Sequence, residues 1–216
     1  MGILVMALSY LLGAVPFGYL IPRWSKKVDI RSLGTGNPGT ANVFRTLGLG
    51  VAIPVGMLDI GKGAATVLLA RAAGLGEEWA LAAGVATVLG HCYSPYLRFQ
   101  GGGGMAASIG VLLALMPLET AVVLPLLGLV YIIITGSSAT GTFVSFTALI
   151  GLAWWQKQPM VHVLAPLVLM ALMGLRLLPH AIRTWRAAPD KGELIYRRLI
   201  RKREIWKRHH ESRRSH

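Results

Sequence analysis

The 216-residue sequence has a single cysteine, Cys92, so no disulfide can form within the chain and a disulfide-rich scaffold is excluded. Charged residues are also scarce, at 14% of the chain, whereas an ordinary soluble domain has about 25%. Apolar residues make up 54%, and the mean hydropathy is +0.56. A soluble fold of 23.2 kDa could not hide so much apolar surface. The composition therefore excludes a soluble enzyme or a disordered chain and indicates a polytopic integral membrane protein.

Acidic residues are few, and the excess of basic residues is uneven. The chain has 22 Lys+Arg against 9 Asp+Glu, for a net charge of +13. Residues 180–216 alone hold 12 of the basic and 4 of the acidic residues. Positive charge is retained on the cytoplasmic side of a membrane, so we expect a cytoplasmic C-terminus. A membrane surface lies beside this tail, so we expect the tail to contact lipid rather than nucleic acid.

Apolar runs predict an all-α bundle of seven membrane spans. The loop Arg23–Arg45 is basic and is expected in the cytoplasm, which puts the N-terminus outside. Counting is ambiguous after Met105, where two crossings instead of four would give five spans. The runs are Ile3–Ile21, Gly48–Ala73, Trp79–Leu97, Met105–Met116, Val122–Thr135, Phe143–Trp155 and Val161–Leu178.

We divide the chain into a membrane-embedded domain, residues 1–180, and a basic cytoplasmic tail, residues 181–216. Within the tail, Leu194–His210 alternates apolar and basic residues. This pattern is compatible with a helix lying on the inner leaflet and equally with a solvated appendage.

The loop Gly34–Gly39 fits the pattern G-x-G-x-x-G. Its neighbours are membrane helices and not a βαβ unit, so the dinucleotide-binding interpretation fails. Glycines still allow backbone N–H groups to converge on an anion, and a helix starting near Thr40 would add a favourable partial charge. Arg45 would then lie about one turn further, within reach of a phosphate. A flexible connection between spans is the alternative.

Asp59 and Lys62 fall inside the second apolar run. They are three residues apart and so share one helix face. Gly63 stands where a P-loop needs a hydroxyl, and no strand precedes the motif, so a nucleotidase is excluded. Charges within a span are costly and face the protein interior or a water-filled cavity. Two hypotheses remain: Lys62 contacts an anion, or the pair holds two helices together.

Further candidates lie in and after the third apolar run. His91 ends an apolar helix within that run, and four glycines, Gly101–Gly104, come after the run. Such a run of glycines can wrap backbone around a ligand or serve as a simple loop. No ligand cluster accompanies His91, so we expect no metal site. The acyltransferase dyad H-x-x-x-x-D is absent from the chain.

In their order and spacing, these motifs resemble those of the acyl-phosphate:glycerol-3-phosphate acyltransferases, small bacterial membrane enzymes of phospholipid synthesis. The resemblance covers roughly residues 3–180. Gly34–Gly48 is similar to the family's G-S-G-N-x-G-A-T-N-x-x-R-x-x-G, and Asp59–Gly63 to D-x-x-K-G. Gly90–Gly104 is similar to G-H-x-x-P-x-x-x-x-F-x-G-G-K-G, and Phe143–Phe146 is weakly similar to Y-V-S-L.

The resemblance implies a site on the cytoplasmic face of a seven-span bundle in the bacterial cytoplasmic membrane. The enzyme would transfer a fatty acyl group from acyl phosphate to the 1-hydroxyl of glycerol 3-phosphate, giving lysophosphatidic acid and phosphate, as a monomer without cofactor or metal. Thr35, Arg45, Lys62 and His91 would be catalytic. The expected substrate-binding residues are Gly34, Gly36, Asn37, Gly39, Asn42, Gly101, Gly102, Gly104, Ser145, His180 and Arg183.

The chain departs from the family pattern at two positions where the family has a polar side chain, a lysine and an asparagine. Gly103 stands where the family has lysine, and Arg183 where it has asparagine. One hypothesis is that Arg183 replaces the charge lost at Gly103. The alternatives are a paralogue that binds or regulates without catalysis, and, from an unrelated class, a small anion transporter, although no inverted repeat is evident.

Overall fold

The computed structural model describes residues 1–130, 133 and 138–187, and within these ranges every regular element is helical. The α-helices are α1 (Gly2–Ala14), α2 (Phe17–Lys26), α3 (Thr40–Leu47), α4 (Leu49–Ala72), α5 (Glu77–Cys92), α6 (Met105–Leu115), α7 (Pro117–Val123), α9 (Ser138–Trp155) and α10 (Met160–Ala187). Two 3-10 turns, η1 (Ile30–Ser32) and η2 (Pro95–Leu97), and a π-helical segment, η3 (Leu124–Leu129), complete the described elements.

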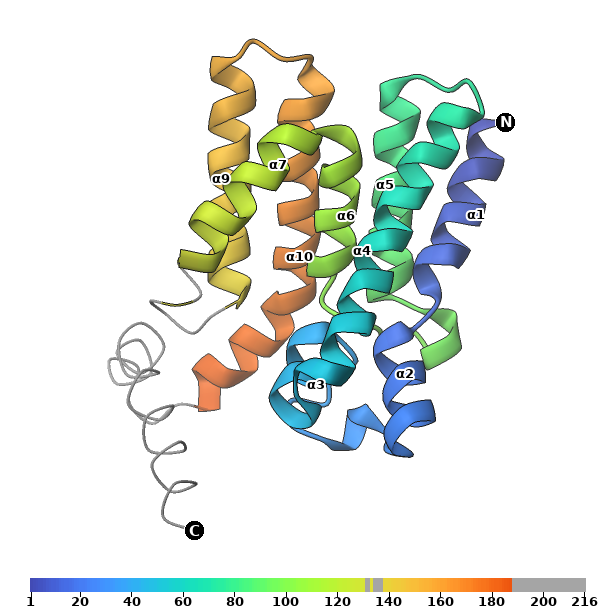
Figure 1. Cartoon of the computed structure of the whole chain (residues 1–216), viewed down its shortest axis with the longest axis vertical. Coiled ribbons are helices and arrows are strands. Elements are labelled where there is room, and N and C mark those ends of the chain that lie inside the picture. The colour runs from blue at the N-terminus through green and yellow to red at the C-terminus, as the bar shows by residue number, and fades with distance from the viewer. Residues whose placement is uncertain (131–132, 134–137, 188–216) are drawn as a thin grey trace.

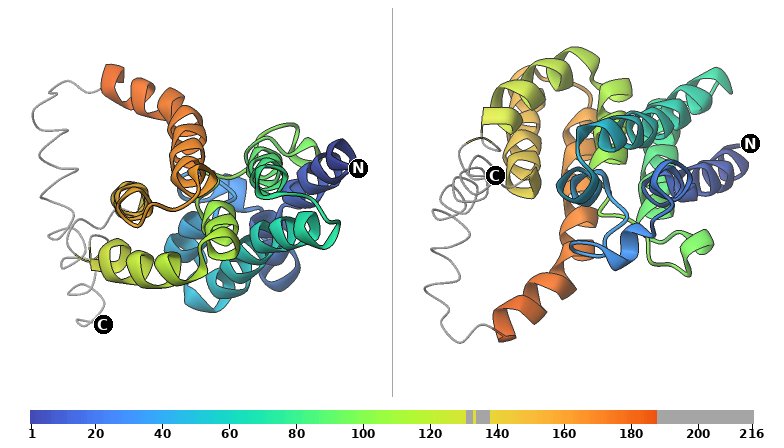
Figure 2. Two further views of the ribbon diagram at one scale, coloured as in Figure 1. Left: turned by 90° about the horizontal axis from the view of Figure 1, so that it is seen from above. Right: turned by 60° about the horizontal axis from the view of Figure 1, so that its bottom comes forward.

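The helices run between two ends of a bundle (Figure 1). The N-terminus lies at one end, with the α4–α5 and α9–α10 turns. Both glycine-rich loops lie at the other end, together with the start of α9 and the end of α10. We call this second end the substrate end. Seen from above, α1, α4 and α5 form one group, whereas α7 and α9 lie on the opposite side of α6 and α10 (Figure 2).

The first apolar run, expected as one span over Ile3–Ile21, consists of two consecutive helices. Helix α1 ends at Ala14 and α2 begins at Phe17. Pro16 lacks a backbone N–H and pushes the preceding residue out of helical geometry, and Val15 accordingly has ψ of 117°. Together the two helices form an apolar stretch of 25 residues. The break exposes the Val15 carbonyl to a partner from another helix.

Close helix crossings depend on glycines that face backbone. A Cβ on Gly13 of α1 would run into the Thr87 backbone of α5, and one on Gly90 of α5 would run into Tyr10 of α1. The α4–α6 crossing repeats this arrangement. Small residues let helix backbones approach in a membrane, where packing replaces the hydrophobic effect as the main attraction between helices.

Three described stretches are long and apolar enough to cross a membrane by length and composition: Gly2–Lys26, Leu49–Ala72 and Met160–Pro179. The shorter apolar helices are Met105–Leu115, Pro117–Leu129 and Ala139–Trp155. The second of them begins at Pro117, before the expected start at Val122. Helix α6 has 11 residues, which corresponds to about 16 Å against a hydrocarbon core of about 30 Å. Pro125 lies at the start of the π-helical segment that continues α7.

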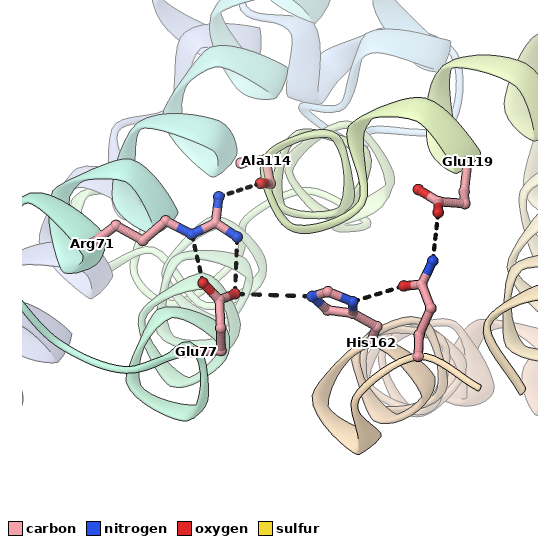
Figure 3. Close-up of polar contacts among 6 residues, drawn as sticks. Arg71, Glu77, Ala114, Glu119 and His162 are labelled. Atoms are coloured by element: carbon pink, nitrogen blue, oxygen red, sulfur yellow. Dashed lines mark hydrogen bonds and ion pairs between the residues drawn. The ribbon is translucent and has the colours of Figure 1, made fainter. Parts of the chain in front are cut away.

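A polar network lies at the end of the bundle opposite the substrate end (Figure 3). Arg71 donates to both carboxylate oxygens of Glu77, at 2.8 and 2.9 Å, and to the Ala114 carbonyl at 2.7 Å. The imidazole Nε2 of His162 lies 4.0 Å from the same carboxylate. Because these residues come from α4, α5, α6 and α10, the network fixes one end of the helices relative to one another.

The all-helical architecture confirms the predicted fold class. The number of spans and their orientation stay predictions, as does the division into two domains. Residues 188–216, which include the proposed interfacial helix Leu194–His210, lie outside the described part of the chain.

Candidate functional site

The first glycine-rich loop is held by one buried amide. Asn42, on the first turn of α3, accepts a hydrogen bond from the Thr35 N–H at 2.9 Å. Its Nδ2 donates to the Leu33 carbonyl at 3.0 Å. A Cβ at Gly34, which has φ of +58°, would meet the Asn42 Oδ1. The geometry therefore gives Asn42 a role in shaping the loop. Position 34 requires glycine, because a Cβ there would collide with the Asn42 side chain.

The loop and α3 rest on a small apolar core of their own. Ile30, Val43 and Val55 are fully buried there, together with Val51 and Ala52 of α4. Helix α3 begins at Thr40, as the sequence predicts. The side chains of Thr35 and Arg45 are exposed to the outside of this unit, and among the described residues neither side chain has a hydrogen-bond partner. They are free to bind a ligand.

The second glycine-rich loop packs against the end of α5. The N–H groups of Gly101 and Gly102 donate to the Cys92 and His91 carbonyls at 3.1 and 3.0 Å. A Cβ on Gly102 would run into the His91 imidazole, and one on Gly101 into the His91 carbonyl. These two glycines are needed because nothing larger fits against the helix end.

Arg176 of α10 clamps this loop, and the sequence analysis did not identify it. Its Nη2 donates to the Gly101 carbonyl at 3.0 Å and its Nε to the Gly102 carbonyl at 3.3 Å. The guanidinium also lies over the Tyr93 ring, 5.4 Å from the centroid. A lone arginine inside the last apolar run was the available signal, since a charge within a span faces the protein interior or a water-filled cavity.

The two loops meet at Asn37 and Gly103. A Cβ built on Gly103 would lie 3.9 Å from Asn37 Nδ2, and one on Gly39 would lie 3.9 Å from the Gly103 nitrogen. Two buried polar groups at this contact, Asn37 Oδ1 and the Thr40 hydroxyl, have no hydrogen-bond partner within the described chain. Helix α3 starts at Thr40 and α6 starts at Met105, so two helix N-termini converge on this contact. Positive partial charge and free backbone N–H groups at such ends favour an anion.

A buried ion pair lies beneath the loops. Lys62 Nζ and Asp59 Oδ1 are 2.8 Å apart, with the two side chains 2% and 1% exposed. Lys62 also donates to the Val15 carbonyl at 3.0 Å, at the break between α1 and α2. Asp59 Oδ1 lies 3.5 Å from His91 Nδ1. The expected pairing on one helix face is confirmed, and its contacts join α4 to α1 and α5.

Of three further expected site residues, the structure describes the side chain of Ser145 and places it away from the loops. Ser145 is fully buried, donates to the Gly141 carbonyl at 2.9 Å and packs against Gly128. His180 and Arg183 belong to α10, but their side chains lie outside the described part of the structure. The roles assigned to these three residues stay predictions.

The described residues contain no group of three or more His, Cys, Asp and Glu side chains suited to a metal ion. The donors at the substrate end are backbone N–H groups, an amide, hydroxyls and guanidinium groups. Donors of this kind bind and neutralise phosphate.

We predict that Arg176→Ala weakens the affinity for inorganic phosphate about tenfold, because two charged hydrogen bonds that hold the loop are lost. Arg176→Lys should recover only part of the affinity, since one ammonium cannot reproduce the fork of a guanidinium. The measurement is a calorimetric titration of the purified protein. The control is Leu175→Ala, whose side chain is 63% exposed on the same helix. Unchanged affinity in Arg176→Ala would show that the clamp is irrelevant to anion binding.

Comparison with known proteins identifies the family. The family model for glycerol-3-phosphate acyltransferase matches residues 3–186. Glycerol-3-phosphate acyltransferase 1 of Deinococcus radiodurans is 50% identical over 115 residues, which cover 53% of this chain and 58% of that protein. The Thermus thermophilus glycerol-3-phosphate acyltransferase is 43% identical over 170 residues, covering 78% and 83%.

The fold is similar to a solved structure. The crystal structure of PlsY (YgiH), described as an integral membrane glycerol 3-phosphate acyltransferase in its glycerol 3-phosphate form, superposes with a TM-score of 0.76. Identity is 26%, and the match covers 90% of this chain and 98% of that one. With its apolar helices, the chain is a multi-pass membrane protein. The protein belongs to the glycerol-3-phosphate acyltransferase family.

Proposed function

We propose that the protein transfers a fatty acyl group from acyl phosphate to the 1-hydroxyl of glycerol 3-phosphate. The observation that carries this proposal is the meeting of two glycine-rich loops and two helix N-termini at Asn37 and Gly103. Both substrates contain phosphate, so the reaction needs anion sites side by side. The family match and the contents of the site support the same reaction.

In the proposed reaction, the glycerol hydroxyl attacks the acyl carbonyl carbon and an ester bond forms. The bond between that carbon and the phosphate oxygen breaks, and the hydroxyl proton leaves with the released phosphate. Acyl phosphate is already activated, so the protein has to position the reactants and neutralise charge. No cofactor or metal enters this scheme.

Thr35 and Arg45 are proposed to contact substrate phosphate directly, since both side chains are exposed beside the first loop. Asn37 and the N–H groups near Gly103 would complete the anion site. Lys62 and His91 are buried among protein groups, so we assign them to positioning the loops. Asn42 shares that role through its bonds to the loop.

The proposal includes seven crossings, counted as α1 with α2, α4, α5, α6, α7 with η3, α9 and α10. The N-terminus would be outside and the substrate end cytoplasmic, because Arg23, Lys26, Lys27 and Arg31 lie beside it. The proposal takes the protein to be a monomer.

The direct test supplies purified protein in lipid with palmitoyl phosphate as donor and glycerol 3-phosphate as acceptor. The measurement is the phosphate released from palmitoyl phosphate. We expect Arg45→Ala to lower kcat/KM tenfold to a hundredfold, because a charged phosphate contact of roughly 1.5–3 kcal/mol is lost. Thr35→Ala should cost less, since the neighbouring N–H groups remain. Arg186→Gln, at an exposed position of α10, is the control. Full activity in folded Arg45→Ala would refute the assignment of this arginine.

Gly103 provides a second prediction, because it has room for a side chain. Its nearest neighbour would be 3.9 Å from a Cβ, and its φ lies outside the left-handed region. If Arg183 supplies the missing cation, Arg183→Ala should nearly abolish phosphate release and Gly103→Lys should restore much of it. Gly103→Lys alone should then change little.

The same assay discriminates the alternatives. Additive effects of the two substitutions would disprove compensation, since groups that share a partner are non-additive. An inactive protein that Gly103→Lys alone activates would instead identify a paralogue that has lost catalysis.

A further inference from the structure

A separate cavity of about 400 Å³ lies between the two 3-10 turns, lined by Arg31, Tyr96, Leu97, Arg98 and Gln100. It shares no lining residue with the contact between Asn37 and Gly103. A Cβ on Gly36 would lie 3.1 Å from the Arg31 carbonyl, so the first glycine-rich loop packs against the backbone of this wall. The reaction proposed above does not use the cavity.

The cavity has an excess of positive charge. Asp29 lies beside it, and its carboxylate accepts from Arg31 Nε and Nη2, at 3.0 and 2.7 Å. These hydrogen bonds lower the pKa of Asp29 to about 2, so one arginine is matched by one ionised carboxylate. Arg98 has no ion-pair or hydrogen-bond partner for its side chain in the described chain. Its guanidinium and the Gln100 amide are therefore available to an anion.

The backbone holds Arg98 in an unusual conformation. Arg98 and Phe99 have φ of 53° and 61°, in the left-handed region that residues with side chains rarely adopt. Hydrogen bonds fix the turn: the Arg98 N–H donates to Pro95 and the Phe99 N–H to Ser94, at 3.2 and 2.8 Å. Such conformations persist where surrounding contacts determine them, and they are frequent at ligand sites.

The same turn carries aromatic side chains outward. Tyr96 is 59% exposed and Phe99 is 61% exposed. Figures 1 and 2 show η2 projecting beyond the helices, near α1 and α2 at the substrate end. Exposed aromatic residues beside arginines at the end of a bundle are typical of the level of lipid headgroups. The anion expected at that level is a lipid phosphate.

We propose that this cavity binds the phosphate of an anionic phospholipid headgroup, with Arg98 as its cationic contact and the Gln100 amide as a second donor. Tyr96 and Phe99 hold the turn at the bilayer interface. The proposal is independent of the catalysed reaction and assigns the protein a lipid site outside its substrate loops.

The test is thermal unfolding of the full chain in detergent, titrated with dihexanoyl phosphatidic acid while glycerol 3-phosphate is held at a saturating concentration. We expect a saturable rise in Tm, since a ligand of the folded state stabilises it. Arg98→Gly suits the left-handed backbone and should weaken the apparent affinity at least tenfold. Arg98→Lys should retain part of the affinity. Arg186→Gln and Arg45→Ala should bind as the native chain does.

Each contrary outcome has a distinct meaning. Equal affinity in Arg98→Gly overturns the proposal. Equal shifts with dihexanoyl phosphatidylcholine would exclude recognition of net negative charge, and equal shifts with inorganic phosphate would exclude a lipid source. Loss of binding in Arg45→Ala, with binding retained in Arg98→Gly, would place the lipid at the substrate loops. None of these outcomes depends on whether the protein is an active acyltransferase.

Discussion

The buried ion pair of Asp59 and Lys62 is the interaction on which the substrate end depends. Removing one partner of such a pair leaves an uncompensated charge and costs about 3–5 kcal/mol, whereas replacing both by apolar residues is often neutral. Stability alone therefore does not explain why two charges are buried here, whereas the contacts of the pair do. Lys62 donates to the Val15 carbonyl and so holds the end of α1. Asp59 faces His91, and the second glycine-rich loop packs against His91.

From this pair the structure continues as a chain of contacts to the site. His91 supports Gly102, and Arg176 fixes the same loop through the Gly101 and Gly102 carbonyls. The second loop in turn meets Asn37, so that α3 and α6 point their N-termini at one place. The site is thus assembled from helices distant in sequence, and the polar network around Arg71 and Glu77 holds the other end of the bundle.

Much of this was predictable because local patterns carry it. The start of α3 at Thr40, the pairing of Asp59 with Lys62 and the short helix α6 follow from glycine placement, helical spacing and run length. Arg176 and the role of Asn42 did not follow, since their partners are backbone carbonyls and N–H groups that only the fold brings near. The break in the first span at Pro16 was missed because the apolar run continues through it.

Hydrogen exchange at the second glycine-rich loop tests most directly whether the ion pair positions the substrate end. In Lys62→Met combined with Asp59→Leu, no buried charge is left unpaired, so we expect near-native stability. The Val15 and His91 contacts are lost, so the Gly101 and Gly102 amides, which donate to the end of α5, should exchange at least tenfold faster than in the native protein. Native exchange rates at these two amides in the folded double variant would contradict the account.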